Sequence, residues 1–595
     1  MNLKKKIFTA VIISVIGLMS WGTGFAQERT AVLLGYIIIP DIVQTMDRIE
    51  KIAATVDPEK YKESDFKDRA EEALADSELE NIDRSRPIML MLFRNTTKGS
   101  GGGMTGLYGI EYAAIVPVKD RDRYMKALQK KNIPCEINDD RIVISNQKSS
   151  LFFAQKEMRF YRKISKQNYN VDARLMVKID NIMSVYSAGI ETTLKMFQRF
   201  NRGMYSGQNR DYESEMAIGR IFLYSLLELA YQSKEFQVDL SIDEKRIDFF
   251  SEYRAMPGSP LSRFFDGETR GDNRCFSILP GKGQITYAGF FDMKRFREFV
   301  DSLLQSALKR DPSLEKYINR DLINAYMDYT KLYNGEFALT YGFSKKGRLE
   351  MNFSAATGSS EDEINAVNER FMSLYKDVME KMGEGMSGFS GYTIQKNFRK
   401  SNGIDVNRYV MEMDVSKMAV QEQKLMQKIF GKEYSIEYAV SNGFMVGSTD
   451  PEKLDKMIVN TTAEADPGKL FSMEAFGPGM DSYADFDIIS FMERIIEISR
   501  MEGADEADPS LEQIRNLIKS LDDSQKNIMF SSKYSKGTSY TKYRIPTKMI
   551  TEIIKSSKSQ SGGGDDEDIY KDEEPYEDEL FDEDGDEEGL FDEDE

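Results

Sequence analysis

Aspartates recur along this chain in one repeated setting, and a carboxylate there could serve either catalysis or structure. Each follows an alternating apolar run and precedes apolar residues at helical spacing; the members are Asp180, Asp292, Asp414 and Asp487, with Asp41 as a looser match. Two carboxylates facing each other across a cleft would suit glycoside hydrolysis. At a helix start, an aspartate would instead accept a hydrogen bond from one of the first backbone N–H groups, which lack partners inside the helix. Because no second catalytic motif accompanies them, the sequence favours structural N-caps.

Histidine is absent from the chain, and this excludes several kinds of chemistry. Catalytic triads and dyads that use histidine as the base are excluded. Zinc sites built on histidine are excluded too, and the two cysteines cannot supply a four-thiolate site. We therefore expect no cofactor, no metal and no enzymatic activity. A carboxylate-dependent hydrolase remains the alternative.

The first 26 residues have the pattern of a secretory signal peptide. Lys4, Lys5 and Lys6 precede an apolar run over residues 7–19, and small residues stand at Gly24 and Ala26. The run is shorter than the roughly 20 residues that span a bilayer. We expect cleavage after Ala26 and export to the periplasm, the cell envelope or the medium. The mature chain should not be an integral membrane protein, and an uncleaved anchor is the alternative.

Cys135 and Cys275 are the two cysteines of the chain. Export would permit a disulfide between them, and closing such a long loop would stabilise the fold by several kcal/mol. Two free thiols are the other possibility. The sequence leaves both open.

The net negative charge of the chain is concentrated in the C-terminal residues 565–595. They contain 20 acidic residues and one lysine, so the remainder of the chain is nearly neutral and lacks the basic character of a nucleic-acid-binding surface. Such a segment cannot build a core and should be disordered. Aromatic residues interrupt it, and LFDED occurs twice, which suits docking onto a cationic partner. The candidate contact residues are Tyr570, Tyr576, Phe581, Asp582, Phe591 and Asp592. A purely solubilising tail is the alternative.

The elements around these residues indicate an α+β protein. Strands run into helices, and alternating runs flank turn-forming residues at 138–140, 243–245, 345–347 and 535–537, which predicts hairpins. The pattern repeats with little residue identity, so we expect two related halves with mainly antiparallel sheets packed on helices. The predicted divisions are a signal peptide (1–26), a first half (27–270), a linker (271–283), a second half (284–555), a Ser/Gly linker (556–564) and the disordered acidic tail (565–595).

Three segments carry a resemblance to known proteins. They are AAIVPVKDRDRYMKAL (113–128), PGSPLSRFF (257–265) and ILPGKGQITYAGFFDMKRF (278–296). With them the chain resembles a loosely defined set of exported bacterial proteins of unknown function built from duplicated α+β modules. The resemblance implies an envelope location and an α+β fold. It carries over no catalytic residues.

These features together predict a binding function. The first expectation is an exported, non-catalytic binding or scaffold protein of the bacterial cell envelope whose acidic tail docks a cationic partner. The second is a periplasmic carrier or chaperone with an apolar groove; methionine, with 33 residues, is common, and methionine-rich surfaces adapt to varied apolar ligands. The third is the carboxylate-dependent hydrolase.

Overall fold

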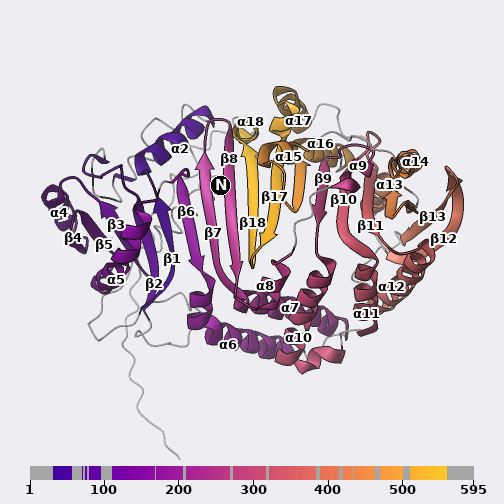
Figure 1. Ribbon diagram of the computed structural model, residues 1–595, viewed down its shortest axis with the longest axis horizontal. Coiled ribbons are helices and arrows are strands. Elements are labelled where there is room, and N and C mark those ends of the chain that lie inside the picture. The colour runs from indigo at the N-terminus through magenta and orange to yellow at the C-terminus, as the bar shows by residue number, and fades with distance from the viewer. Residues whose placement is uncertain are drawn as a thin grey trace, which may run out of the picture.

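Eighteen strands form one antiparallel sheet that runs through the whole molecule (Figure 1). The computed structural model describes residues 31–56, 70–71, 74, 76, 79–95, 110–167, 169–205, 210–267, 273–316, 320–382, 389–413, 420–431, 433–462, 470–499 and 509–558. The predicted signal peptide, the Ser/Gly linker from residue 559 and the acidic tail lie outside these residues. The predicted α+β class is confirmed, but the sheets expected in two halves are one continuous sheet.

The first half contributes one end of this sheet. Its strands are β1 (Ala31–Ile39), β2 (Ile88–Asn95), β3 (Ile110–Pro117), β4 (Cys135–Asn138), β5 (Arg141–Ser145), β6 (Ala173–Lys178), β7 (Ser233–Ile242) and β8 (Arg246–Ala255). Their hydrogen-bonded order is β4-β5-β3-β2-β1-β6-β7-β8. The predicted hairpins at 138–140 and 243–245 are confirmed as the β4–β5 and β7–β8 connections.

The second half contributes the other end. Its strands are β9 (Ile285–Phe290), β10 (Tyr333–Phe343), β11 (Leu349–Thr357), β12 (Phe389–Ser401), β13 (Ile404–Met413), β14 (Tyr434–Ser441), β15 (Phe444–Ser448), β16 (Ser482–Asp487), β17 (Asn527–Ser535) and β18 (Thr538–Pro546). They pair in the order β12-β13-β14-β15-β11-β10-β9-β16-β17-β18. Hairpins at 345–347 and 535–537 are confirmed. From β14 to β18 this order follows that of the first half, and β12 and β13 extend it.

The helices pack along the edges and over both faces of the sheet. In the first half they are α2 (Ile42–Val56), α4 (Arg121–Lys130), α5 (Lys148–Ile164), α6 (Ile179–Tyr205), α7 (Arg210–Tyr231) and α8 (Pro260–Phe264). Later along the chain come α9 (Arg274–Ile278), α10 (Met293–Arg310), the 3-10 helix η3 (Pro312–Lys316), α11 (Arg320–Lys331), α12 (Glu361–Met382), α13 (Val420–Phe430), α14 (Pro451–Asn460), α15 (Phe471–Phe476), α16 (Ile488–Ser499), α17 (Pro509–Ser520), the 3-10 helix η6 (Asp523–Lys526) and α18 (Thr547–Lys558).

The last strands of the two halves join them. β8 pairs with β18 over nine positions, from Arg254 opposite Thr538 to Arg246 opposite Pro546. Helices join them as well, because Ala217 and Tyr224 of α7 pack with Ala307 of α10. Figure 1 shows β6, β7, β8, β18 and β17 side by side in the middle of the sheet. There α2, α18, α17 and α16 lie along one end of the strands, and α6, α7, α8 and α10 along the other.

Separate hydrophobic cores cover the outer parts of the sheet. One face packs against α5 in the first half and against α9, α14 and α15 in the second. The opposite face packs against α2 and α4 in the first half and against α11 and α12 in the second. The central strands lie between these covered regions, and their two faces differ in chemistry.

The segment predicted as a linker between the halves is partly core. Residues 274–278 form α9, and Cys275, Phe276 and Ile278 are buried against β10 and α14. Charged and glycine residues around this short helix gave the segment the composition of a linker. Its apolar residues nevertheless belong to the core of the second half. They pack against elements that come much later in the chain, and local composition does not reveal such contacts.

Candidate functional site

The predicted helix-cap aspartates are confirmed at three of the described positions. Asp292 accepts a hydrogen bond from the backbone N–H of Arg295 (3.1 Å) at the start of α10. Asp487 accepts from the backbone N–H of Ser490 (2.9 Å) and from its hydroxyl (2.7 Å) at the start of α16. Asp41 accepts from two backbone N–H groups of the first turn of α2. These carboxylates therefore begin helices.

Asp180 is not a helix cap, and here the prediction is wrong. β6 ends at Lys178 and α6 begins at Ile179, so Asp180 already lies inside the first helical turn. Its carboxylate accepts from the adjacent backbone N–H of Asn181 (2.8 Å). Because α6 begins at Ile179, the cap position falls at Lys178, two residues before the aspartate. Asp414 lies outside the described residues.

Cys135 and Cys275 are both free thiols, so the structure has no bridge between them. Cys275 is buried in the core of the second half, while Cys135 packs against that of α2 and α4 in the first half. Burial raises the pKa of the Cys275 thiol, and the nearby Glu336 carboxylate raises it further. A thiol held in its neutral form is a poor nucleophile.

Asp485 is a buried carboxylate outside the set of recurring aspartates. Its oxygens accept from the backbone N–H groups of Phe471 (2.7 Å) and Ser472 (2.8 Å) at the start of α15. Burial raises the pKa of Asp485, and the hydrogen bonds offset only part of this effect. Its partners are therefore the backbone donors of a helix, as at the capping aspartates.

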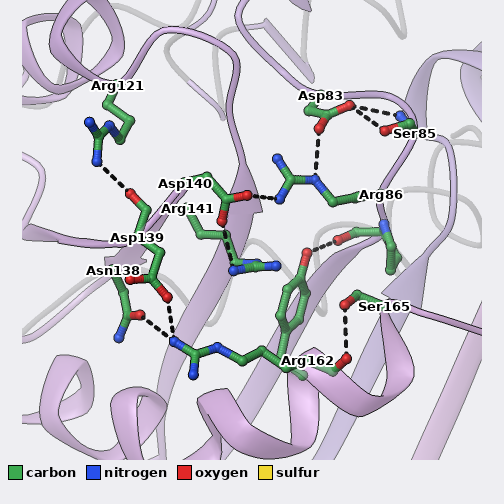
Figure 2. Close-up of polar contacts among 12 residues, drawn as sticks. Asp83, Ser85, Arg86, Arg121, Asn138, Asp139, Asp140, Arg141, Arg162 and Ser165 are labelled. Carbon is green, nitrogen blue, oxygen red and sulfur yellow. Dashed lines mark hydrogen bonds and ion pairs between the residues drawn. The ribbon is translucent and has the colours of Figure 1, made fainter.

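The β4–β5 turn carries two adjacent carboxylates inside a network of arginines (Figure 2). Asp140 pairs with Arg86 and with Arg141, and Asp139 pairs with Arg162. Burial alone would raise the pKa of Asp140, but the hydrogen bond from Arg86 and the charge of Arg141 outweigh it and lower the pKa. The lowered pKa keeps Asp140 charged, and both carboxylates are paired with arginines, which suits a structural network better than proton transfer.

A polar hollow of about 490 Å³ opens beside one end of strands β9, β10 and β11. Lys282, Gln284, Glu350, Lys453 and Asp487 line it. Lys453 pairs with Glu350, and the Gln284 amide bonds the carbonyl of Ser490 (3.2 Å). Asp487 caps α16, so most of these polar groups already hold parts of the fold together.

A row of apolar side chains crosses the middle of the sheet on the face that also carries α2 and α12. Residues paired across antiparallel strands point to the same face. Seven successive pairings connect Leu240, Phe249, Tyr543, Phe530, Ala484, Tyr287, Leu339 and Phe353, on β7, β8, β18, β17, β16, β9, β10 and β11. We call this row the apolar strip.

The apolar strip is partly exposed, whereas several polar residues on the other face of the same strands are buried. Every member of the apolar strip is partly exposed, and Tyr543 is 41% exposed. Polar neighbours that point to the opposite face, such as Asp239, Thr286 and Thr340, are buried. Exposed apolar residues that form a continuous surface mark a binding region more often than scattered ones do.

Helices border the apolar strip along both of its long sides. On one side Ile545 and Ile528 pack with residues of α16, α17 and α18. On the other, Tyr253 and Tyr534 pack with α8, α10 and neighbouring rings. Aromatic rings also contact each other within the strip and beside it. The ring centroids of Phe530 and Tyr543 lie 5.1 Å apart in a tilted arrangement, and those of Tyr287 and Phe337 lie 4.9 Å apart in a stacked one.

The opposite face of the central strands is charged. Arg174 forms a two-pronged pair with Asp239 (2.6 Å), and Arg544 does so with Asp248 (2.7 Å). Arg254 joins Glu235 at 2.6 Å. On β7, β8 and β18 this charged face and the apolar strip therefore lie back to back.

The apolar strip was not predicted from the sequence. Alternation in segments such as EFALTYGF (336–343) does mark one apolar side for each strand. It cannot tell whether that side meets a helix or remains partly open. This depends on where helices from other parts of the chain pack.

The chain could not be assigned to a known family by similarity. The chain matches no known family model, no curated protein and no solved structure. Among the described helices, none is both long and apolar enough to cross a membrane. The described residues also hold no group of three or more acidic or cysteine side chains placed to bind a metal ion.

Proposed function

We propose that the protein is an exported, non-catalytic binding protein of the bacterial cell envelope that carries a long acyl chain on its apolar strip. One observation supports this most directly: partly exposed apolar side chains form an unbroken row across eight paired strands. At the spacing of strands in a sheet, this row is about 33 Å long.

The chemistry of the strip favours an acyl chain over an extended polypeptide. Each strand beneath the strip is paired on both sides, so its backbone N–H and C=O groups are already bonded within the sheet. A polypeptide lying there would leave its own backbone groups without partners, which is unfavourable in an apolar site. An acyl chain has no such groups. It gains about 0.8 kcal/mol for each methylene that leaves water.

The rest of the chain is consistent with carriage rather than catalysis. The signal-peptide pattern at the N-terminus supports export. Asp292, Asp487 and Asp485 each accept hydrogen bonds from backbone N–H groups at a helix start, which favours structural roles for them over the hydrolase alternative.

A fluorescent fatty acid tests the proposal. We expect cis-parinaric acid to bind the chain that starts at Gln27 and Tyr543→Lys to weaken binding at least about tenfold, a loss of about 1.4 kcal/mol. The ammonium group would need to lose water beside the acyl chain. Tyr540→Lys is the matched control, because residue 540 lies on the same strand but faces the charged side.

The purified protein gives a second measurement. Native mass spectrometry should detect a lipid that dissociates under activation, and Tyr543→Lys should lose it while Tyr540→Lys retains it. Equal binding of parinaric acid by both variants would place the ligand elsewhere and refute the role of the strip. Binding of an unfolded apolar peptide but not of the fatty acid would point to a chaperone.

We also propose that the halves descend from one duplicated unit. The strand order β4-β5-β3-β2-β1-β6-β7-β8 and the order β14-β15-β11-β10-β9-β16-β17-β18 support this. Aligned homologues should then share apolar positions between β1–β8 and the matching strands of the second half. An ancestor with a different strand order in one half would contradict the proposal.

A further inference from the structure

Two aromatic and two basic side chains meet at the centre of the charged face. Phe250 of β8 stands opposite Lys542 of β18, and Tyr540 of β18 stands opposite Lys533 of β17. All four point to one face, because paired residues share a face and positions two apart on a strand do so too. The rings of Phe250 and Tyr540 stack with centroids 6.3 Å apart. We call these four residues the central patch.

The two lysines differ from the other cations nearby. Arg174, Arg254 and Arg544 each pair with a carboxylate on this face. Lys533 and Lys542 have no ion-pair partner among the described carboxylates, and both are partly exposed. The central patch therefore offers a ring surface with two cationic groups beside it.

A peptide segment that contains both acidic and aromatic residues would complement such a patch. An incoming ring can stack on Phe250 and Tyr540, and carboxylates beside it can pair with the two ammonium groups. The chain itself contains this chemistry twice, as LFDED at 580–584 and 590–594. We propose that the acidic tail of the same chain docks on the central patch through Phe581 or Phe591.

The place where the described chain ends makes this contact reachable. β18 leads directly into α18, which ends at Lys558. Along these two elements Lys542 and Lys558 are at most about 30 Å apart. A flexible chain of roughly 33 residues, the separation of Phe591 from Lys558, has an end-to-end distance of about 30 Å. A chain of this length is therefore long enough to pass the ends of the strands from α18, which borders the apolar strip, and to reach the patch. Such a tether gives a high effective concentration.

Docking in this way gives the tail a role in the isolated protein. It would cover the charged face while leaving the apolar strip on the opposite face open. The two sites can therefore be tested separately: parinaric acid reports on the strip, and a probe in the tail reports on the patch.

A single tryptophan in the tail measures the contact. The chain from Gln27 contains no tryptophan, since Trp21 precedes it. In the full chain carrying Phe591→Trp, and separately Phe581→Trp, we expect blue-shifted emission and acrylamide quenching several-fold weaker than for the free tail peptide. In 1 M NaCl, where the Debye length falls to about 3 Å, emission should move toward that of the peptide.

Substitution of the lysines locates the docking site. Lys533→Gln with Lys542→Gln should return the tryptophan emission and quenching to those of the free peptide. Lys345→Gln with Lys346→Gln is the matched control, because these exposed lysines lie in the β10–β11 turn. Circular dichroism and thermal melting would show that both double variants fold. Phe250→Ala provides a second variant, which removes one ring of the patch and leaves its charges.

The outcomes decide the proposal. Emission and quenching that respond to Lys533 and Lys542, and stay unchanged on dilution, support docking within one chain. A signal that weakens on dilution would mean docking between chains and would overturn the proposal as stated. Peptide-like emission in the unsubstituted background, or a blue shift that survives loss of both lysines, would also overturn it.

Discussion

At the scale of single residues, carboxylates in this protein act mainly by accepting hydrogen bonds and pairing with cations. Glu235 is an example on the charged face, where it contacts both Lys178 and Arg254. Burial alone would raise the pKa of Glu235, but the hydrogen bond from Lys178 and the charges of Lys178 and Arg254 outweigh it and lower the pKa.

This pKa shift predicts how stability depends on pH. A carboxyl group whose pKa is lower in the folded state stabilises the fold above its unfolded pKa, and that contribution is lost as pH falls through the folded pKa. We therefore expect Glu235→Gln to lower the urea midpoint at neutral pH and to make less difference once pH falls well below the ordinary value of 4.5. Urea unfolding at a series of pH values measures this. A difference that grows with acidification would contradict it.

At the scale of elements, the position of an aspartate relative to its helix decides what it contributes. Asp487 stands immediately before α16 and accepts from Ser490, while Asp180 lies within the first turn of α6. Both have the strand–aspartate–helix pattern in the sequence. The difference of one or two positions at the strand end separates a cap from a residue that is already helical.

Substitution by alanine should separate the two aspartates. We expect Asp487→Ala to destabilise the protein by about 1 kcal/mol, because a first-turn N–H group of α16 loses its partner. Asp180→Ala should have a smaller effect, because this carboxylate accepts from the N–H of the adjacent residue Asn181 and otherwise interacts with the helix dipole. Hydrogen exchange at the first turn of α16, measured in both variants, checks this. Equal exchange in the two would mean that the Asp487 contact contributes little.

At the scale of the whole molecule, the β8–β18 pairing makes two halves into one body. Nine paired positions and the contact of α7 with α10 cross between the halves. The apolar strip depends on this junction, because Phe249 comes from the first half and Tyr543 from the second. Neither half contains the complete strip.

The junction should hold the molecule together even when the chain is cut. We expect a protease site inserted after Gly267 to yield, after cleavage of the folded protein, two fragments that still elute together in gel filtration. Adding Thr541→Pro should weaken this association strongly, because proline cannot donate to the ladder and β18 is paired on both sides. Thr541→Val, which keeps the backbone donor, is the control. Fragments that separate without the proline would show that the junction contributes little binding.

Much of the local structure could be predicted from the sequence. Alternating apolar residues around Asp243-Glu244-Lys245 and Lys345-Lys346-Gly347 predicted hairpins that are present, because strand alternation and turn chemistry act over a few residues. The α+β class followed from these elements. The caps at Asp292 and Asp487 could be predicted for the same reason.

The pairing of strands that are distant in the sequence could be seen only in the tertiary structure. No local pattern relates Leu240 to Leu339, yet pairing through the strands between them places both in one row. The pairing of β8 with β18, the burial of Cys275 and the open side of the central strands arise in the same way. Each depends on contacts between residues far apart in the chain, whose register is set by the packing of whole elements.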